Sequence, residues 1–165
     1  MKNQDEILRA ICLGNDDALG FLLMLGSISQ VWDDLIDRDM PVGDIDINQM
    51  MLSALIDMQY NPFYQQHQAA LLPVMELAII NWQTANHHEI GRNAQMLHVS
   101  YVKRSVLTDI MIWVARLVGG RAHALQLAPA IEAAVFLEDA NDYEHYRAEV
   151  LRTSEGVGQN QQEKN

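Results

Sequence analysis

The chain has 165 residues, of which 22 are acidic and 11 are basic, so its formal charge is −11. This length is typical of one domain, and 49% of the residues are apolar, as in packed globular proteins rather than disordered ones. The excess negative charge argues against a nucleic-acid binder, because the phosphate backbone would be repelled. Cys12 is the single cysteine, which excludes an intrachain disulfide, argues against a cysteine-based zinc site and suits a reducing, cytoplasmic setting.

The charge is unevenly distributed along the chain. Residues 1–91 contain 13 acidic and three basic residues, whereas residues 92–165 contain nine acidic and eight basic ones. The segment 92–121 is locally basic and has Asp109 as its one acidic residue. It is either a solvated helix face that pairs with the acidic helices or an anion-binding wall opposite a carboxylate cluster. The N-terminus lacks the apolar run of a signal peptide, and charges interrupt the apolar stretches, so we expect a soluble protein without a membrane span.

Apolar residues recur every three to four positions through most of the chain, which is the pattern of amphipathic helices. The expected helix starts are Asn15, Asp46 and Asn61-Pro62, and the expected ends are Gly14 and Gly119-Gly120. Pro73 either kinks a helix or opens the next one, and a turn is expected near Pro129. In chain order, the expected helices cover about residues 4–13, 16–37, 46–58, 62–83, 92–118, 130–139 and 141–153.

Strand signals are almost absent, and the chain shows neither an internal repeat nor a sustained heptad pattern. We therefore predict an all-α fold: a single-domain helical bundle of about six to seven helices over residues 1–153. The two most apolar helices, 16–37 and 92–118, are expected at its centre. Residues 154–165 are expected to form a polar, disordered tail. The side chains expected in the core include Cys12, Trp32, Leu35 and Ile36.

A first candidate site is the cluster Asp33, Asp34 and Asp37. On a helix these carboxylates crowd one side, where like charges repel each other. They also lie at the helix C-terminus, where the dipole disfavours anions. Mg²⁺ is a natural partner to offset this cost, because it binds carboxylates together with water and substrate phosphates. The alternative is a solvated helix end tied down by Arg38 or a neighbouring lysine.

A second candidate site lies on the last expected helix. Asn141, His145 and Glu149 are spaced four residues apart and form one polar stripe. Their amide oxygen, ring nitrogen and carboxylate are all able to hold a cation. The alternative is a solvated helix of mixed charge, with internal pairs such as Glu144–Arg147.

Together the two clusters resemble the paired motifs of class I isoprenoid and terpenoid synthases, here in a chain about half the usual length. Those all-helical enzymes hold Mg²⁺ between a DDxxD motif and an (N/D)Dxx(S/T)xxxE motif. The first motif is matched by Asp33, Asp34 and Asp37, and the second by Asn141, Asp142 and Glu149, with His145 where Ser or Thr is usual. The resemblance implies metal binding by Asp33, Asp34, Asp37, Asn141, His145 and Glu149, and binding of a substrate diphosphate by Lys103 or Arg104.

Three functional hypotheses follow. The first is a magnesium-dependent enzyme acting on a diphosphate-bearing substrate, either isoprenoid-synthase-like or similar to the small helical nucleotide pyrophosphohydrolases. The second is a non-catalytic accessory protein whose acidic face binds a basic protein partner, with Met50, Met51 and Met58 in an adaptable interface. The third, compatible with both, is a homodimer. The chain contains no dinucleotide-binding, P-loop or GxSxG motif.

Overall fold

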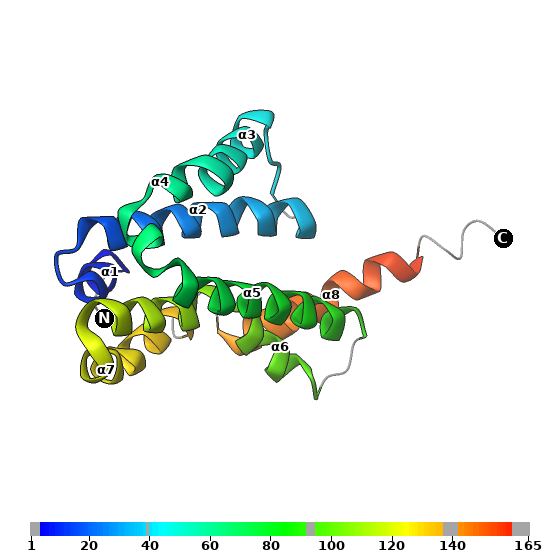
Figure 1. The fold of residues 1–165 in the computed structure, drawn as a ribbon. Helices are drawn as coiled ribbons and strands as arrows, with labels where there is room; N and C mark the ends of the chain where they lie inside the picture. Colours follow the sequence, from blue (N-terminus) through cyan, green and yellow to red (C-terminus); the bar gives the residue numbers. More distant parts are fainter. Residues whose placement is uncertain (1–3, 39, 92–94, 137–141, 160–165) are drawn as a thin grey trace.

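The computed structural model describes residues 4–38, 40–91, 95–136 and 142–159. Within these ranges the regular structure is entirely helical, which confirms the predicted all-α bundle (Figure 1). The elements are α1 (Gln4–Cys12), α2 (Asp16–Asp37), α3 (Asp44–Leu52), the π-helical turn η1 (Ser53–Asp57), α4 (Met58–Tyr60), α5 (Pro62–Ile90), α6 (Leu97–Arg104), α7 (Val106–Phe136) and α8 (Tyr143–Gln159).

Local capping signals determine where the first helices begin. The side chain of Asn15 accepts a 2.9 Å hydrogen bond from the Ala18 N–H at the start of α2. Asn61 caps α5 in the same way, with Pro62 at the first helical position, so both predicted starts are confirmed. The predicted start at Asp46 was wrong, because α3 begins at Asp44 and the Asp46 carboxylate accepts a hydrogen bond from the Gly43 N–H instead.

The second half of the bundle is divided differently from the prediction. Helix α5 continues through Pro73 to Ile90, and the helix expected over 92–118 is interrupted at Ser105, which has non-helical backbone angles. Gly120 breaks α7 with φ 80° and ψ −178°, in agreement with the predicted glycine stop. The chain then continues as helix through Pro129, where a turn was expected.

The last helix, α8, continues to Gln159, so the predicted domain end at residue 153 lies inside a helix. Residues 160–165, the remainder of the predicted tail, lie outside the described residues.

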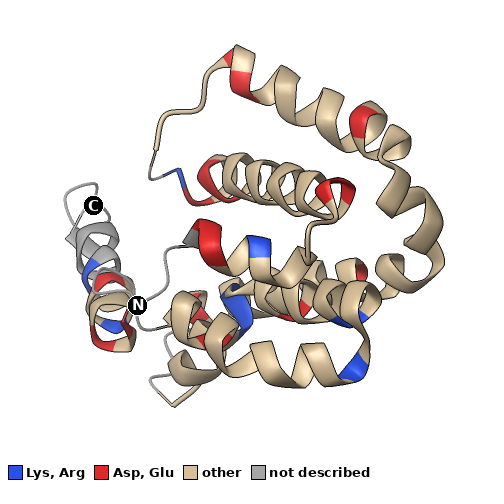
Figure 2. Ribbon diagram, turned by 90° about the vertical axis from the view of Figure 1, so that its left-hand side faces the viewer, with Lys and Arg blue, Asp and Glu red and all other residues tan. Residues whose placement is uncertain are grey.

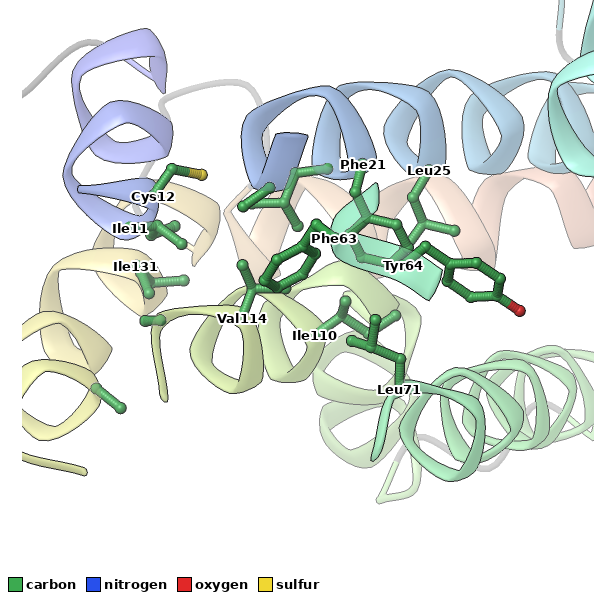
Figure 3. Close-up of a cluster of buried hydrophobic side chains, with 14 of the residues drawn as sticks. Ile11, Cys12, Phe21, Leu25, Phe63, Tyr64, Leu71, Ile110, Val114 and Ile131 are labelled. Atoms are coloured by element: carbon green, nitrogen blue, oxygen red, sulfur yellow. The ribbon is translucent and has the colours of Figure 1, made fainter. Parts of the chain in front are cut away.

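The core is formed where α1, α2, α5 and α7 meet (Figure 3). Phe21 of α2 packs against Phe63 and Tyr64 of α5, with ring centroids 5.9 and 6.0 Å apart. Helix α5 runs between α2 and α7 (Figure 1), so it is a central element beside α2. Cys12 is buried as expected. The rest of α2 is less covered than predicted, because Leu35 and Ile36 are 37% and 49% exposed.

By length and hydropathy, α2 also meets the criteria for a membrane-crossing helix, which core helices of globular proteins share. Its residues Phe21, Leu22 and Leu25 are buried in the core.

Candidate functional site

Arg104, at the C-terminal end of α6, lies at the centre of three carboxylates. Its guanidinium donates hydrogen bonds to Oδ1 of Asp33 at 3.2 Å and to Asp37, both on α2. It also donates to Oε2 of Glu89 on α5 at 2.9 Å. We call these four residues the Arg104 cluster. One guanidinium faces three carboxylates, so the cluster carries a net charge of −2.

The cluster explains how the chain tolerates carboxylates at unfavourable positions. Asp33 and Asp37 are one turn apart near the C-terminus of α2, and Glu89 is in the last turn of α5, so each helix dipole opposes them. Arg104 offsets this cost. Burial alone would lower the pKa of the guanidinium, but the hydrogen bond to Asp37 and the charges of Glu89, Asp37 and Asp33 outweigh it and raise the pKa.

Aromatic and hydroxyl groups support the cluster from both sides. The indole N–H of Trp82 donates a 2.9 Å hydrogen bond to Oδ1 of Asp33, and its ring lies 4.2 Å from that of Trp32. On α8, the hydroxyl of Tyr146 donates to Oε1 of Glu89 at 2.6 Å. The hydroxyl oxygen of Ser100 lies 2.9 Å from the same Glu89 oxygen. Burial and the bond to Glu89 raise the pKa of Tyr146, so its phenol stays protonated over a wide pH range.

The Arg104 cluster lines a cavity of about 1060 Å³. His145 and Glu149 of α8 line the same cavity, so the two polar clusters identified in the sequence lie around one space. Much of the remaining wall is apolar and includes Leu22, Leu23, Trp32, Val106, Leu107 and Met111. The cavity therefore has a charged part and an apolar part.

One buried polar atom on the cavity wall has no hydrogen-bond partner among the described residues. This is the hydroxyl oxygen of Thr108, a residue only 7% exposed that belongs to the cavity lining. Buried hydroxyls are usually hydrogen-bonded, but this atom has almost no accessible surface, so a molecule in the cavity would not reach it in the present arrangement.

Asp34 and Lys103, two of the remaining candidate residues, are not among the residues that line the cavity. The carboxylate of Asp34 accepts a hydrogen bond from the side-chain amide of Gln30 at 2.9 Å. Lys103 donates to the side-chain oxygen of Asn81 at 2.6 Å, whereas the neighbouring Arg104 faces the cavity. Asn141 lies outside the described residues.

Four residues of the site were not identified from the sequence. They are Trp82, Glu89, Ser100 and Tyr146. Glu89 carried a usable signal, because an acidic residue in the last turn of a helix is as unfavourable as the aspartates of α2. The other three are ordinary helical residues, and only the tertiary contacts reveal their role.

Carboxylate oxygens line part of the cavity. Asp33, Asp37 and Glu149 offer carboxylate oxygens in a region of net negative charge. Across the described ranges, no group of three or more His, Cys, Asp and Glu side chains forms a ready-made metal site.

Searches of protein-family models, of curated proteins and of solved structures found no match to this chain.

Proposed function

We propose that the chain binds, and acts on, a small molecule with a diphosphate group and an apolar tail, together with Mg²⁺, in the cavity lined by the Arg104 cluster and α8. The observation that carries this proposal is the meeting of Asp33 and Asp37 with His145 and Glu149 around one cavity, although α2 and α8 lie near opposite ends of the described chain. The activity would be isoprenoid-synthase-like, in keeping with the motif resemblance.

The two parts of the cavity match the two parts of such a ligand. Its apolar wall, which includes Leu107 and Met111, would bind the tail, and the charged part would face the head group. The volume of about 1060 Å³ is slightly larger than the range usual for small-molecule sites, roughly 300–1,000 Å³.

Charge supports a metal-assisted mode of binding. A bare diphosphate would be repelled by the Arg104 cluster, whose net charge is −2, and by Glu149. Mg²⁺ held by Asp33, Asp37 and Glu149 would neutralise the diphosphate and favour its departure as a leaving group. Arg104 would hold Asp33 and Asp37 in place through its N–H groups, and the protonated Tyr146 would keep Glu89 in position.

The proposal is tested by calorimetric titration with Mg²⁺ alone, pyrophosphate alone and both together. Because the site is acidic, pyrophosphate alone should bind weakly, and it should bind about 10-fold or more tightly when Mg²⁺ is present. Geranyl diphosphate with Mg²⁺ should bind about 100-fold more tightly than pyrophosphate, since the apolar wall would cover its tail. Equal affinity for pyrophosphate with and without Mg²⁺ would contradict the proposal.

Matched variants separate the site from general charge effects. Asp33→Asn with Asp37→Asn should abolish the Mg²⁺-dependent gain, whereas Asp44→Asn with Asp57→Asn, an equal charge change at two exposed positions, should retain it. Glu149→Gln, also at an exposed position, changes none of the four residues of the Arg104 cluster. This variant should weaken the Mg²⁺-dependent increase in affinity for pyrophosphate. If the two double variants behave alike, the cavity is not the site.

A further inference from the structure

The segment from α3 to α4, residues 44–60, forms an arm that lies along α2 on the side away from α7 (Figure 1). Neither α3 nor η1 contributes a buried residue, and Met58 is the buried residue of α4. The arm is thus attached by one narrow face, and its outer face has no neighbouring element in the described structure.

The outer face of the arm is unusually apolar. Ile45 is 82% exposed, Leu52 53% and Ile56 49%. These three residues are seven and four positions apart, so they lie on one side of the helix as a stripe, which the exposed polar side chains of Asn48 and Gln49 interrupt between Ile45 and Leu52. Leu55 and Tyr60, 59% and 77% exposed, extend the apolar surface. Isolated exposed apolar residues are normal, but several on one helix face are typical of an interaction site.

The inner face of the arm already has its own apolar contacts. Ile47, Met50 and Ala54 are only partly exposed, and Met58 is 5% exposed. The outer stripe is therefore additional to the residues that attach the arm. Of the three methionines expected in an interface, Met58 is buried, and Met51 is the one that is well exposed, at 46%.

The arm is acidic and carries no basic residue. Asp44, Asp46 and Asp57 belong to it, and residues 39–91 contain no lysine or arginine. Figure 2 shows the arm at the top of the molecule in tan and red, without blue. On the helix, Asp44 lies to one side of the apolar stripe, and Asp46 and Asp57 lie to the other.

We propose that the outer face of the arm binds a basic amphipathic helix of a partner protein. The apolar side of such a helix would cover Ile45, Leu52 and Ile56, and its lysines or arginines would pair with the flanking carboxylates. A second copy of this chain is less suited to this face, because pairing two arms would place the acidic residues Asp44 and Asp57 of each copy against acidic residues of the other. The π-helical turn η1 lies within this face, and such turns recur at functional sites.

The test is the binding of a labelled amphipathic peptide of leucine and lysine, about 18 residues long, followed by fluorescence anisotropy. Its counterpart with glutamate in place of lysine is the charge control. The lysine peptide should bind at 50 mM salt and at least about 10-fold more weakly at 500 mM, since the carboxylate contribution is screened. The glutamate peptide should not bind. Equal binding of both peptides, or binding of neither, would overturn the proposal.

Matched variants locate the surface. Ile45→Ser with Leu52→Ser and Ile56→Ser should weaken binding of the lysine peptide about 10-fold or more, as loss of central apolar contacts does. Leu72→Ser with Leu77→Ser and Ile80→Ser removes α5 side chains of 47–53% exposure and should leave binding within about twofold. If both triple variants lose binding equally, the arm is not the site.

Two further measurements test whether a second copy of this chain or a lipid surface, rather than a protein helix, covers the outer face of the arm. Sedimentation at micromolar protein should give a monomer, and a dimer dissociated by the arm variant but not by the α5 variant would assign the face to a second copy. Vesicles of anionic lipid should not bind, because the arm is acidic. Vesicle binding that requires Ile45, Leu52 and Ile56 would overturn the assignment to a protein helix.

Discussion

The hydroxyl of Tyr146 on α8 donates a 2.6 Å hydrogen bond to Oε1 of Glu89 at the end of α5, 57 residues earlier in the chain. The other carboxylate oxygen of Glu89 accepts a hydrogen bond from Arg104. Glu89 therefore connects the last helix to the Arg104 cluster, and Tyr146 and Glu89 both line the cavity. This carboxylate is one of the groups that hold α8 in place, together with His98, whose ring stacks on Tyr143 with centroids 4.0 Å apart.

The hydrogen bond from Tyr146 to Glu89 should make the free energy of unfolding depend on pH in the alkaline range. Burial and the bond to Glu89 raise the pKa of Tyr146, so the folded protein holds the phenolic proton more tightly than the unfolded chain does. The stabilisation is fully present below the unfolded pKa of about 10 and is lost as pH rises through the higher folded pKa. Tyr146→Phe should lower the free energy of unfolding by about 1–2 kcal/mol at pH 7, and this difference should shrink above about pH 10.

Thermal unfolding between pH 7 and 11, followed by circular dichroism, measures this effect. Tyr60→Phe is the control, because the Tyr60 side chain is exposed. A Tyr146→Phe difference that stays constant across this pH range would contradict the assigned bond.

Removal of Arg104 should be strongly destabilising, because it leaves three partly buried carboxylates without their cation. We expect Arg104→Met to lower the free energy of unfolding by about 2–4 kcal/mol. Adding Glu89→Gln to this variant should recover part of the loss, since one of the opposed charges is removed. Arg121→Met, at an exposed position on α7, should change stability by less than about 0.5 kcal/mol. Urea unfolding of the wild type, the single variants Arg104→Met, Glu89→Gln and Arg121→Met, and the double variant tests this. Additive effects of Arg104→Met and Glu89→Gln would count against a shared cluster.

The break in α7 should depend on glycine at position 120. Its φ of 80° with ψ of −178° is a conformation that other residues adopt at a cost of about 1–3 kcal/mol, so Gly120→Ala should destabilise by that amount. Gly26 is in the interior of α2, and a Cβ there meets nothing within 4 Å. Gly26→Ala should therefore raise stability by up to about 1 kcal/mol. Denaturant midpoints provide the comparison, and equal effects of the two substitutions would show that the break is not locally strained.

The Cys12 thiol should be unreactive in the folded protein. It is 2% exposed, and burial raises its pKa to about 11, so little thiolate forms at neutral pH. With an aromatic disulfide reagent at pH 8, the folded protein should react at least about 100-fold more slowly than the protein in guanidinium chloride. Fast reaction without denaturant would mean that α1 opens readily from α7.

The parts of the fold that were predictable from the sequence are those determined by neighbouring residues. Asn15 and Asn61-Pro62 cap helices because a short polar side chain reaches an N–H group within the same turn. Gly120 interrupts a helix because of its own backbone conformation, with φ 80°. The continuation through Pro129 and the break at Ser105 depend on how the helices pack, so no local pattern revealed them. Leu35 and Ile36 follow an apolar periodicity, yet the arm covers only part of α2 and leaves them exposed.

Only the electrostatically unfavourable part of the candidate site, the aspartates of α2, was predictable from the sequence. Asp33 and Asp37 stood out because like charges at a helix C-terminus need compensation. The group that compensates them is 67–71 residues away, and sequence separation gives no indication of such a contact. For the same reason the supporting bonds from Trp82 and Tyr146 emerged from the structure alone.

The sequence distances within the Arg104 cluster have a consequence for the rates of folding and unfolding. Contacts between segments 67 and 71 residues apart require large loops to close, so they form after the individual helices during folding. Interactions that are absent from the folding transition state act mainly on the rate of unfolding. Loss of Arg104 should thus shorten the lifetime of the native protein far more than it slows refolding, and the Arg104 cluster determines how long the helices around the cavity remain assembled.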